Sequence, residues 1–95
     1  MTTKLKINTT SGYKRDLKQL NKQGKDFSKL AYVVNKLANG EVLEEKYKDH
    51  KLTGYEIPDC RECHIEPDWL LIYRIYKNEL ILLLVTTGSH SNLFK

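Results

Sequence analysis

The stretch that decides the fold is residues 61–94, which read RECHIEPDWLLIYRIYKNELILLLVTTGSHSNLF. Branched and aromatic residues fill the segment Trp69–Tyr76, and a strongly apolar run follows in Glu79–Thr86. Both compositions are typical of β-strands. Lys77 and Asn78 between them suit a two-residue turn, because asparagine tolerates a positive φ. The pattern predicts an antiparallel hairpin whose second strand, apolar on both faces, is central in a sheet and covered.

Two further strands are expected upstream of this hairpin. Asp59–Ile65 has a strand-like composition, and Pro67 with Asp68 breaks the chain before the hairpin begins. Near the N-terminus, polar and apolar residues alternate over Lys4–Asn8, which predicts a short strand. The intervening residues 41–55 are charged and irregular, with one turn of helix expected near residues 43–48.

Two helices are expected between the N-terminal strand and the meander. The first spans Gly12–Gln23, after N-cap candidates at residues 9–11, and the second follows the capping residue Asp26. Its apolar residues recur at three and four positions from Phe27 to Ala38, which is one stripe of a helix lying on a sheet. The short link at Gly24 predicts an antiparallel helix pair. The expected fold is therefore α+β: an N-terminal strand, an antiparallel helix pair, and a three-stranded antiparallel meander with the helices packed on one face.

Length and composition place the chain among small globular proteins. Its 95 residues predict a single domain over 1–95, and 40% hydrophobic with 29% charged residues suits a folded protein. No apolar run approaches the roughly 18 residues of a membrane helix, and the first residues do not resemble a secretory signal. We therefore expect a cytoplasmic protein with no membrane partner, in which the two cysteines stay reduced.

The net charge of +4 is unevenly distributed along the chain. Residues 1–51 hold 12 Lys and Arg against 6 Asp and Glu, whereas residues 52–95 hold 4 against 6. The basic half carries Lys14, Lys18 and Lys22 at successive four-residue steps of the first helix. Such a surface favours a polyanion such as nucleic acid. Simple solubility explains the same charges, so this feature alone leaves both interpretations open.

The segment Cys60–His64 contains a C-x-x-C-H pattern, which is typical of covalent haem attachment. Haem attachment normally accompanies export, and the only methionine is Met1, so no distal ligand is available. Half of a zinc site is a second interpretation, but no second close pair of ligands follows in the sequence. A thioredoxin-like pair would open a helix, and this pair lies in a predicted strand. We therefore expect incidental cysteines, with Cys63 half-buried, and no metal or other cofactor.

The candidate chemistry consists of imidazole and carboxylate groups. Histidine titrates near neutral pH and serves as a general acid or base. Phosphodiester cleavage in RNA needs a base for the 2′-OH, an acid for the leaving 5′-oxygen, and cations for the developing charge. Without a metal, the acid, base and cationic groups can be His50, His64, Asp68, His90, Lys51 and Arg61. Trp69 or Phe94 can stack on an unpaired base.

A purely structural interpretation of the same residues stays open at this point. His64 then alternates into a strand face as a hydrogen-bonded residue, and His90 belongs to a tail. In this interpretation the C-terminal segment serves to place Leu93 and Phe94 on the core.

Three short segments of the sequence resemble those of a known family. KYKDHKL at residues 46–52, RECHIEPDWLLIY at 61–73 and TGSHSNLF at 87–94 resemble the YafQ-like branch of the RelE/ParE toxin superfamily. The resemblance implies a bacterial toxin of a type II toxin–antitoxin pair, which cuts messenger RNA in the ribosomal A site and leaves a 2′,3′-cyclic phosphate and a 5′-hydroxyl. Its implied partners are a cognate antitoxin, the ribosome with its 16S RNA, the messenger RNA, and operator DNA only through the antitoxin complex.

The resemblance also implies positions for the active site. They fall on His50, His64, Asp68, His90 and Phe94, and Trp69 adjoins them. Our hypothesis makes His90 the general acid, Asp68 the base or the group that orients it, and the other two histidines the binders of phosphate charge. The basic N-terminal half then holds ribosomal RNA through Lys14, Lys18, Lys22, Lys25 and Lys29.

One departure from the wider superfamily separates the possible mechanisms. RelE proper relies on lysine, arginine and a C-terminal tyrosine, whereas this tail has no tyrosine and no arginine follows Arg74. The histidine-based branch therefore fits the sequence better. The alternatives are a ParE-like toxin that binds DNA gyrase and cuts nothing, and a small basic interaction module.

Overall fold

The computed structural model describes residues 4–94. The α+β class is as predicted. The elements in chain order are β1 (Lys6–Thr9), α1 (Ser11–Lys22), α2 (Phe27–Ala38), a single 3-10 turn η1 (Glu45–Tyr47), β2 (His50–Lys51), β3 (Arg61–Glu66), β4 (Trp69–Tyr76), β5 (Ile81–Gly88) and α3 (His90–Leu93).

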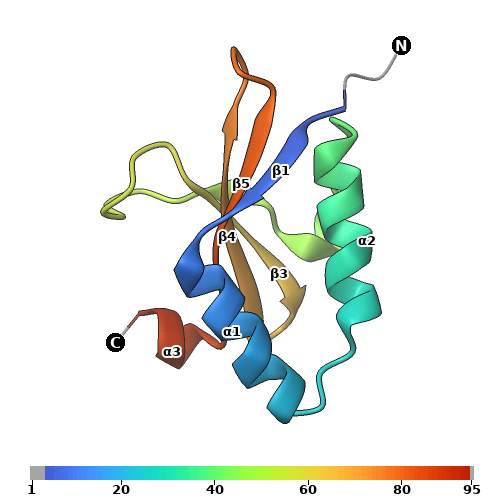
Figure 1. Ribbon diagram of the computed structural model, residues 1–95, viewed down its shortest axis with the longest axis vertical. Coiled ribbons are helices and arrows are strands. Elements are labelled where there is room, and N and C mark those ends of the chain that lie inside the picture. The colour runs from blue at the N-terminus through green and yellow to red at the C-terminus, as the bar shows by residue number, and fades with distance from the viewer. Residues whose placement is uncertain (1–3, 95) are drawn as a thin grey trace.

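The sheet has five strands in the order β1-β5-β4-β3-β2 (Figure 1). Strands β3, β4 and β5 form the predicted antiparallel meander. β1 adds to it in parallel beside β5, which makes β5 an interior strand as expected. The N-terminal strand was predicted, whereas β2 was missed, because it is only two residues long and no alternation can reveal it.

Two strand boundaries differ from the prediction for reasons of backbone conformation. β3 begins at Arg61 rather than Asp59, because Asp59 has φ 59°, which is incompatible with an extended strand. The β4–β5 turn spans four residues rather than two, since Tyr76 pairs with Ile81. Leu80, the last residue of this turn, has φ 56°.

Side-chain caps determine where the helices begin. The Thr10 hydroxyl accepts the backbone N–H of Tyr13 at 3.0 Å and donates to the Val85 carbonyl at 2.6 Å, so it starts α1 and ties it to β5. The Asp26 carboxylate accepts the Ser28 N–H at 3.0 Å at the start of α2. The two helices run in opposite directions and diverge from their short link (Figure 1), which confirms the helix pair.

Both helices bury their apolar stripes on one face of the sheet, as predicted (Figure 1). The main core lies between them and the sheet. Its strand residues include Cys63, Leu71, Tyr73, Leu82 and Leu84, and its helix residues are Tyr13, Leu20, Leu30, Val33, Val34, Leu37 and Ala38.

The opposite face of the sheet carries a smaller core around Cys60, Ile72 and Val85. Residues 52–57 and the C-terminal segment cover it, and Leu93 and Phe94 pack there as predicted. Glu62 and His64, on β3, point to this same face, because they alternate with the main-core residues Cys63 and Ile65. Among the described residues, no helix is long and apolar enough to cross a membrane.

The two cysteines are packing residues that face different cores. Cys63 belongs to the main core and Cys60 to the smaller one, and both side chains are fully buried. Burial raises the pKa of the Cys63 thiol to about 12, and it also raises the pKa of Cys60. The expectation that Cys63 is half-buried was therefore wrong, because this strand position faces the helices.

Candidate active site

A buried carboxylate lies between two histidines on the face of the sheet opposite the helices. His50 on β2 pairs with Glu62 on β3, and His64 follows two residues later on the same face. Glu62 Oε1 is 3.4 Å from His50 Nε2 and 3.9 Å from His64 Nε2. Glu62 is only 6% exposed, whereas the His50 and His64 side chains are 50% and 26% exposed, so a substrate can reach both imidazoles.

The surrounding carbonyl groups orient these two imidazoles. His50 Nδ1 lies 2.7 Å from the carbonyl oxygen of Lys48, and His64 Nδ1 lies 3.3 Å from that of Pro67. Each ring therefore has an oxygen acceptor near both of its nitrogens. The cluster therefore holds two accessible imidazole rings beside one buried carboxylate.

A second group of polar residues forms where β5 ends and α3 begins. The Asp68 carboxylate accepts the backbone N–H of His90 at 3.2 Å, so it holds the first residue of α3 in place. The His90 imidazole lies beside the Phe94 ring, with centroids 4.9 Å apart at 43°. No hydrogen bond between described residues involves the His90 imidazole, and this side chain is exposed. The backbone of His90 is thus held by Asp68, while the nitrogens of its ring make no hydrogen bond with another described residue.

The β3–β4 turn joins the two groups. His64 contacts the carbonyl of Pro67, and the next residue, Asp68, contacts His90. At the same end of the sheet, Leu70 pairs with Gly88, which brings the start of β4 beside the end of β5. The strand register thus places His64, Asp68 and His90 at this end of the sheet, whereas His50 pairs with Glu62, two residues further along β3.

A hydrogen-bond network under this end of the sheet fixes β5. The Asp16 carboxylate on α1 accepts the Thr86 hydroxyl and the Thr87 N–H, the latter at 3.1 Å. The Thr87 hydroxyl donates to the Leu70 carbonyl at 2.7 Å and accepts the Trp69 indole N–H at 2.9 Å. The sequence gives no signal for Asp16, because its partners are about seventy positions away.

The predicted role of Trp69 as a base-stacking residue was wrong. Its side chain has no exposed surface, and it packs edge-on against Phe27, with ring centroids 6.4 Å apart, in the core that the helices cover. Lys25 Nζ lies 5.9 Å from the centre of its ring. A base cannot reach this ring, because strand alternation after Asp68 turns residue 69 into the core.

The structure also separates Lys51 and Arg61 from the histidines. These two residues pair with each other across β2 and β3, so their side chains lie on the face opposite that of His50. The Arg61 guanidinium binds the Asp49 carboxylate at 3.2 and 3.3 Å, and the Tyr73 hydroxyl donates to the same carboxylate. Asp49 thereby raises the pKa of Arg61, and this cluster fastens the strand that carries His50.

The five lysines predicted to bind the ribosome fall into two groups. Lys14, Lys18 and Lys22 are exposed on α1, and none of the ion pairs between residues 4–94 involves them. Lys25 and Lys29 both pair with Glu66, at 3.3 and 2.7 Å. That carboxylate cancels one of their two charges, so the α1 stripe is the stronger candidate for an anionic partner.

Glu62 is the site residue that the sequence analysis missed. A signal for it exists, because residues 62 and 64 are two apart in a predicted strand and must share a face. The strand pairing with His50 could not be read from the sequence, since β2 was not predicted. Among the described residues, no three His, Cys, Asp or Glu side chains are grouped so that they could hold a metal ion.

Comparison with known proteins gives consistent results. The sequence profile of a family described as bacterial toxin of type II toxin–antitoxin system, YafQ, matches residues 5–95. The mRNA interferase toxin YafQ of Escherichia coli K12 is 38% identical over 89 residues, which are 93% of this chain and 94% of that protein. A metal-bound toxin from Helicobacter pylori has 50% identity and a TM-score of 0.89 over 95% of this chain and 99% of its own. A chain of the E. coli DinJ–YafQ toxin–antitoxin complex has 36% identity and a TM-score of 0.87 over 97% and 99%.

Proposed function

Because this chain belongs to the YafQ family of bacterial toxins of type II toxin–antitoxin systems, we propose that it cuts messenger RNA on the ribosome with its own imidazole and carboxylate groups. The chain is an mRNA interferase, that is, an endoribonuclease. The gyrase-binding alternative is not retained, since it needs no cluster of histidines and the curated relatives are interferases.

One observation supports the proposed mechanism: each histidine of the chain lies beside a carboxylate, His50 and His64 beside Glu62, and His90 at the helix start that Asp68 holds. An RNA phosphate there meets two oriented imidazoles on one side and a free imidazole on the other. This is the division of labour that in-line transesterification requires, with charge balance at the phosphate and a proton donor at the leaving oxygen.

The proposed reaction proceeds by attack of the ribose 2′-oxygen on the adjacent phosphorus. Asp68 accepts the 2′-OH proton, and the bond from phosphorus to the 5′-oxygen breaks as His90 donates a proton to that oxygen. His50 and His64, held by Glu62, offset the charge of the pentacoordinate state. The products are a 2′,3′-cyclic phosphate and a 5′-hydroxyl, so no atom or electron is gained from outside.

The proposed partners follow from the same family. A cognate antitoxin binds and silences the toxin, as DinJ forms a toxin–antitoxin complex with E. coli YafQ. The ribosome and its messenger RNA supply the substrate, and operator DNA is contacted only through the antitoxin complex.

The experiment that tests this function is messenger cleavage in a reconstituted translation system, with 5′-ends mapped and 2′,3′-cyclic phosphate measured. Cuts within codons of translated message, absent without ribosomes, are expected. Cuts on naked RNA at the same rate would contradict the ribosome dependence, and products ending in a simple 3′-phosphate from the start would contradict the transesterification.

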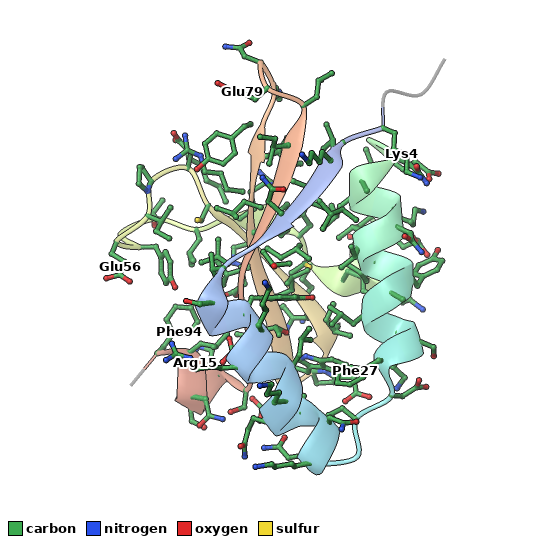
Figure 2. The ribbon with its side chains drawn as sticks, in the orientation of Figure 1. Lys4, Arg15, Phe27, Glu56, Glu79 and Phe94 are labelled. Carbon is green, nitrogen blue, oxygen red and sulfur yellow. The ribbon has the colours of Figure 1, made fainter. Side chains whose placement is uncertain are left out.

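Removing the charge of Glu62 tests the central carboxylate. Glu62→Gln is expected to lower kcat/KM for cleavage by about 10–100-fold, because each charge-assisted contact to the histidines is worth about 1–3 kcal/mol. The control is Glu79→Gln, which removes the same charge at the tip of the β4–β5 turn. Figure 2 shows Glu79 far from Phe94. The double variant Glu62→Gln, His50→Ala tests whether the two residues act together. If its loss of log kcat/KM equalled the sum of the two single losses, Glu62 would not act through His50.

Reversing the α1 lysines tests ribosome binding. Changing Lys14, Lys18 and Lys22 to glutamate is expected to abolish ribosome association at moderate salt. Neutral glutamine variants should reduce the log–log salt slope by about 2–3, since each phosphate contact contributes roughly 0.7–0.9. The control reverses three other exposed lysines, Lys4, Lys6 and Lys77, toward the other end of the sheet, so both proteins change net charge equally. Equal binding by both reversed proteins, measured by ribosome sedimentation, would contradict the role of the stripe.

A further inference from the structure

A cavity of about 480 Å³ opens beside His64, along the part of the β3 edge that β2 leaves unpaired. We propose that it binds the nucleotide next to the scissile phosphate of single-stranded RNA; this rests on the proposed function and adds a substrate subsite to it. Its walls come from η1, the end of β3, the following turn and α2. The lining residues used in the argument are Lys29, Lys46, Tyr47, Lys48, His64 and Glu66.

The charge of this cavity suits an anion. Glu66 is the only acidic residue that lines it, and this carboxylate is held by Lys29 at 2.7 Å and by Lys25 at 3.3 Å. Lys46 and Lys48 take part in none of the ion pairs between described residues, and both are exposed. Two lysines outside these ion pairs therefore line a cavity whose one carboxylate is already paired.

An aromatic ring in the same wall points to a nucleotide rather than to a simple anion. Tyr47 is half-buried, and its ring is held by Tyr32 at 6.1 Å between centroids and by Lys46 Nζ at 5.2 Å from its centroid. A fixed aromatic ring beside free cations is the combination that binds unpaired bases together with their phosphates. Tyr47 thus offers this cavity an aromatic ring that Trp69, which is buried in the core, cannot supply.

The cavity is physically continuous with the catalytic histidines. His64 lines the cavity and also contacts Glu62 at 3.9 Å. Lys48 has φ 50°, a left-handed conformation in which its carbonyl lies 2.7 Å from His50 Nδ1 while its side chain lines the cavity. A phosphate bound by His50 and His64 therefore leaves the adjoining nucleotide at the mouth of this cavity. Lys46 and Lys48 thus supply cations at this cavity, whereas Arg61 is held by Asp49 and neither Arg61 nor Lys51 lines it.

The first test compares cleavage by Lys46→Gln and Lys48→Asn with the control Lys77→Gln. Asparagine is chosen at 48 because it tolerates a positive φ. Each subsite variant is expected to lower kcat/KM for translated message about 3–10-fold, mainly through KM, because a partly exposed phosphate contact is lost while the catalytic groups remain. If the wild type cuts and both variants retain the kcat/KM of the control, the subsite is wrong.

The second test does not depend on cleavage. A 2′-O-methyl trinucleotide lacks the attacking hydroxyl, so it can bind but cannot be cut. Titrating it into the ¹⁵N-labelled protein is expected to shift amide signals of residues 46–48 and 64–67, and the two variants should weaken its binding about 3–10-fold. Binding with shifts confined to other residues overturns the subsite. A wild type that cuts no RNA yet shows these shifts overturns the proposed function and leaves the subsite supported.

Discussion

Replacing His90 with alanine is expected to reduce kcat for messenger cleavage by about 10²–10⁴-fold, which is the usual contribution of a general acid or base. The imidazole is exposed, and no hydrogen bond between described residues involves it, so its loss removes chemistry rather than structure. The backbone N–H that Asp68 accepts is present in alanine as well. α3 should therefore begin at the same place, and the free energy of unfolding should change by less than about 1 kcal/mol.

The matched control for His90 is Ser91→Ala, on the next residue of the same short helix. Ser91 is exposed, and its hydroxyl lies 3.3 Å from that of Ser89 at the helix start. Both variants should give wild-type circular dichroism and urea midpoints, while only the histidine variant loses cleavage. A folded His90→Ala protein that cuts at the wild-type rate would refute the assignment of the general acid.

Replacing Trp69 with alanine is expected to lower the free energy of unfolding by about 3–5 kcal/mol, the usual range for removing a large buried aromatic side chain. The indole is fully buried, packs against Phe27 and donates to Thr87. A domain of this size has a total stability of about 5–14 kcal/mol, so the variant should unfold at markedly lower urea concentration. Equilibrium unfolding followed by circular dichroism measures the loss.

Trp69→Phe distinguishes packing from base stacking at this position. Phenylalanine can stack on a base, but it fills less volume and cannot donate to Thr87. If Trp69 is a core residue, the phenylalanine variant should lose about 1–3 kcal/mol of stability and keep its cleavage rate at temperatures where it is folded. A variant with wild-type stability and a large loss of cleavage would reinstate the base-stacking role.

Much of the fold follows from local patterns. The three-residue and four-residue spacing in α2, the cap at Asp26 and the dense apolar runs of β4 and β5 each predict their element without long-range information. The elements that were missed or shifted are those whose existence depends on a distant partner. β2 has only two residues and exists because Glu62 and Arg61 pair with it.

In the candidate site, too, local sequence predicted some features and distant contacts decided the others. The residue types and the three matching segments indicated phosphodiester chemistry and a family. The structure places His50 and His64 beside Glu62, and it places His90 beside Asp68 and Phe94. Which of their neighbours take part was decided by side-chain direction. Trp69 adjoins Asp68 in sequence yet faces the core, and Arg61 adjoins Glu62 yet binds Asp49 on the other face.

By itself the sequence determined the order of the longer elements, the helix stripes, the meander and the set of titratable groups, because these depend on residues within a few positions of one another. Only the tertiary structure decided that Glu62 lies between two histidines, that Asp16 supports β5 from α1, and that Lys46 and Lys48 rather than Lys51 border the site. Successive strand residues point to opposite faces, so a shift of one position in pairing exchanges the buried and the reactive side chains. That register is fixed by contacts between segments far apart in the chain.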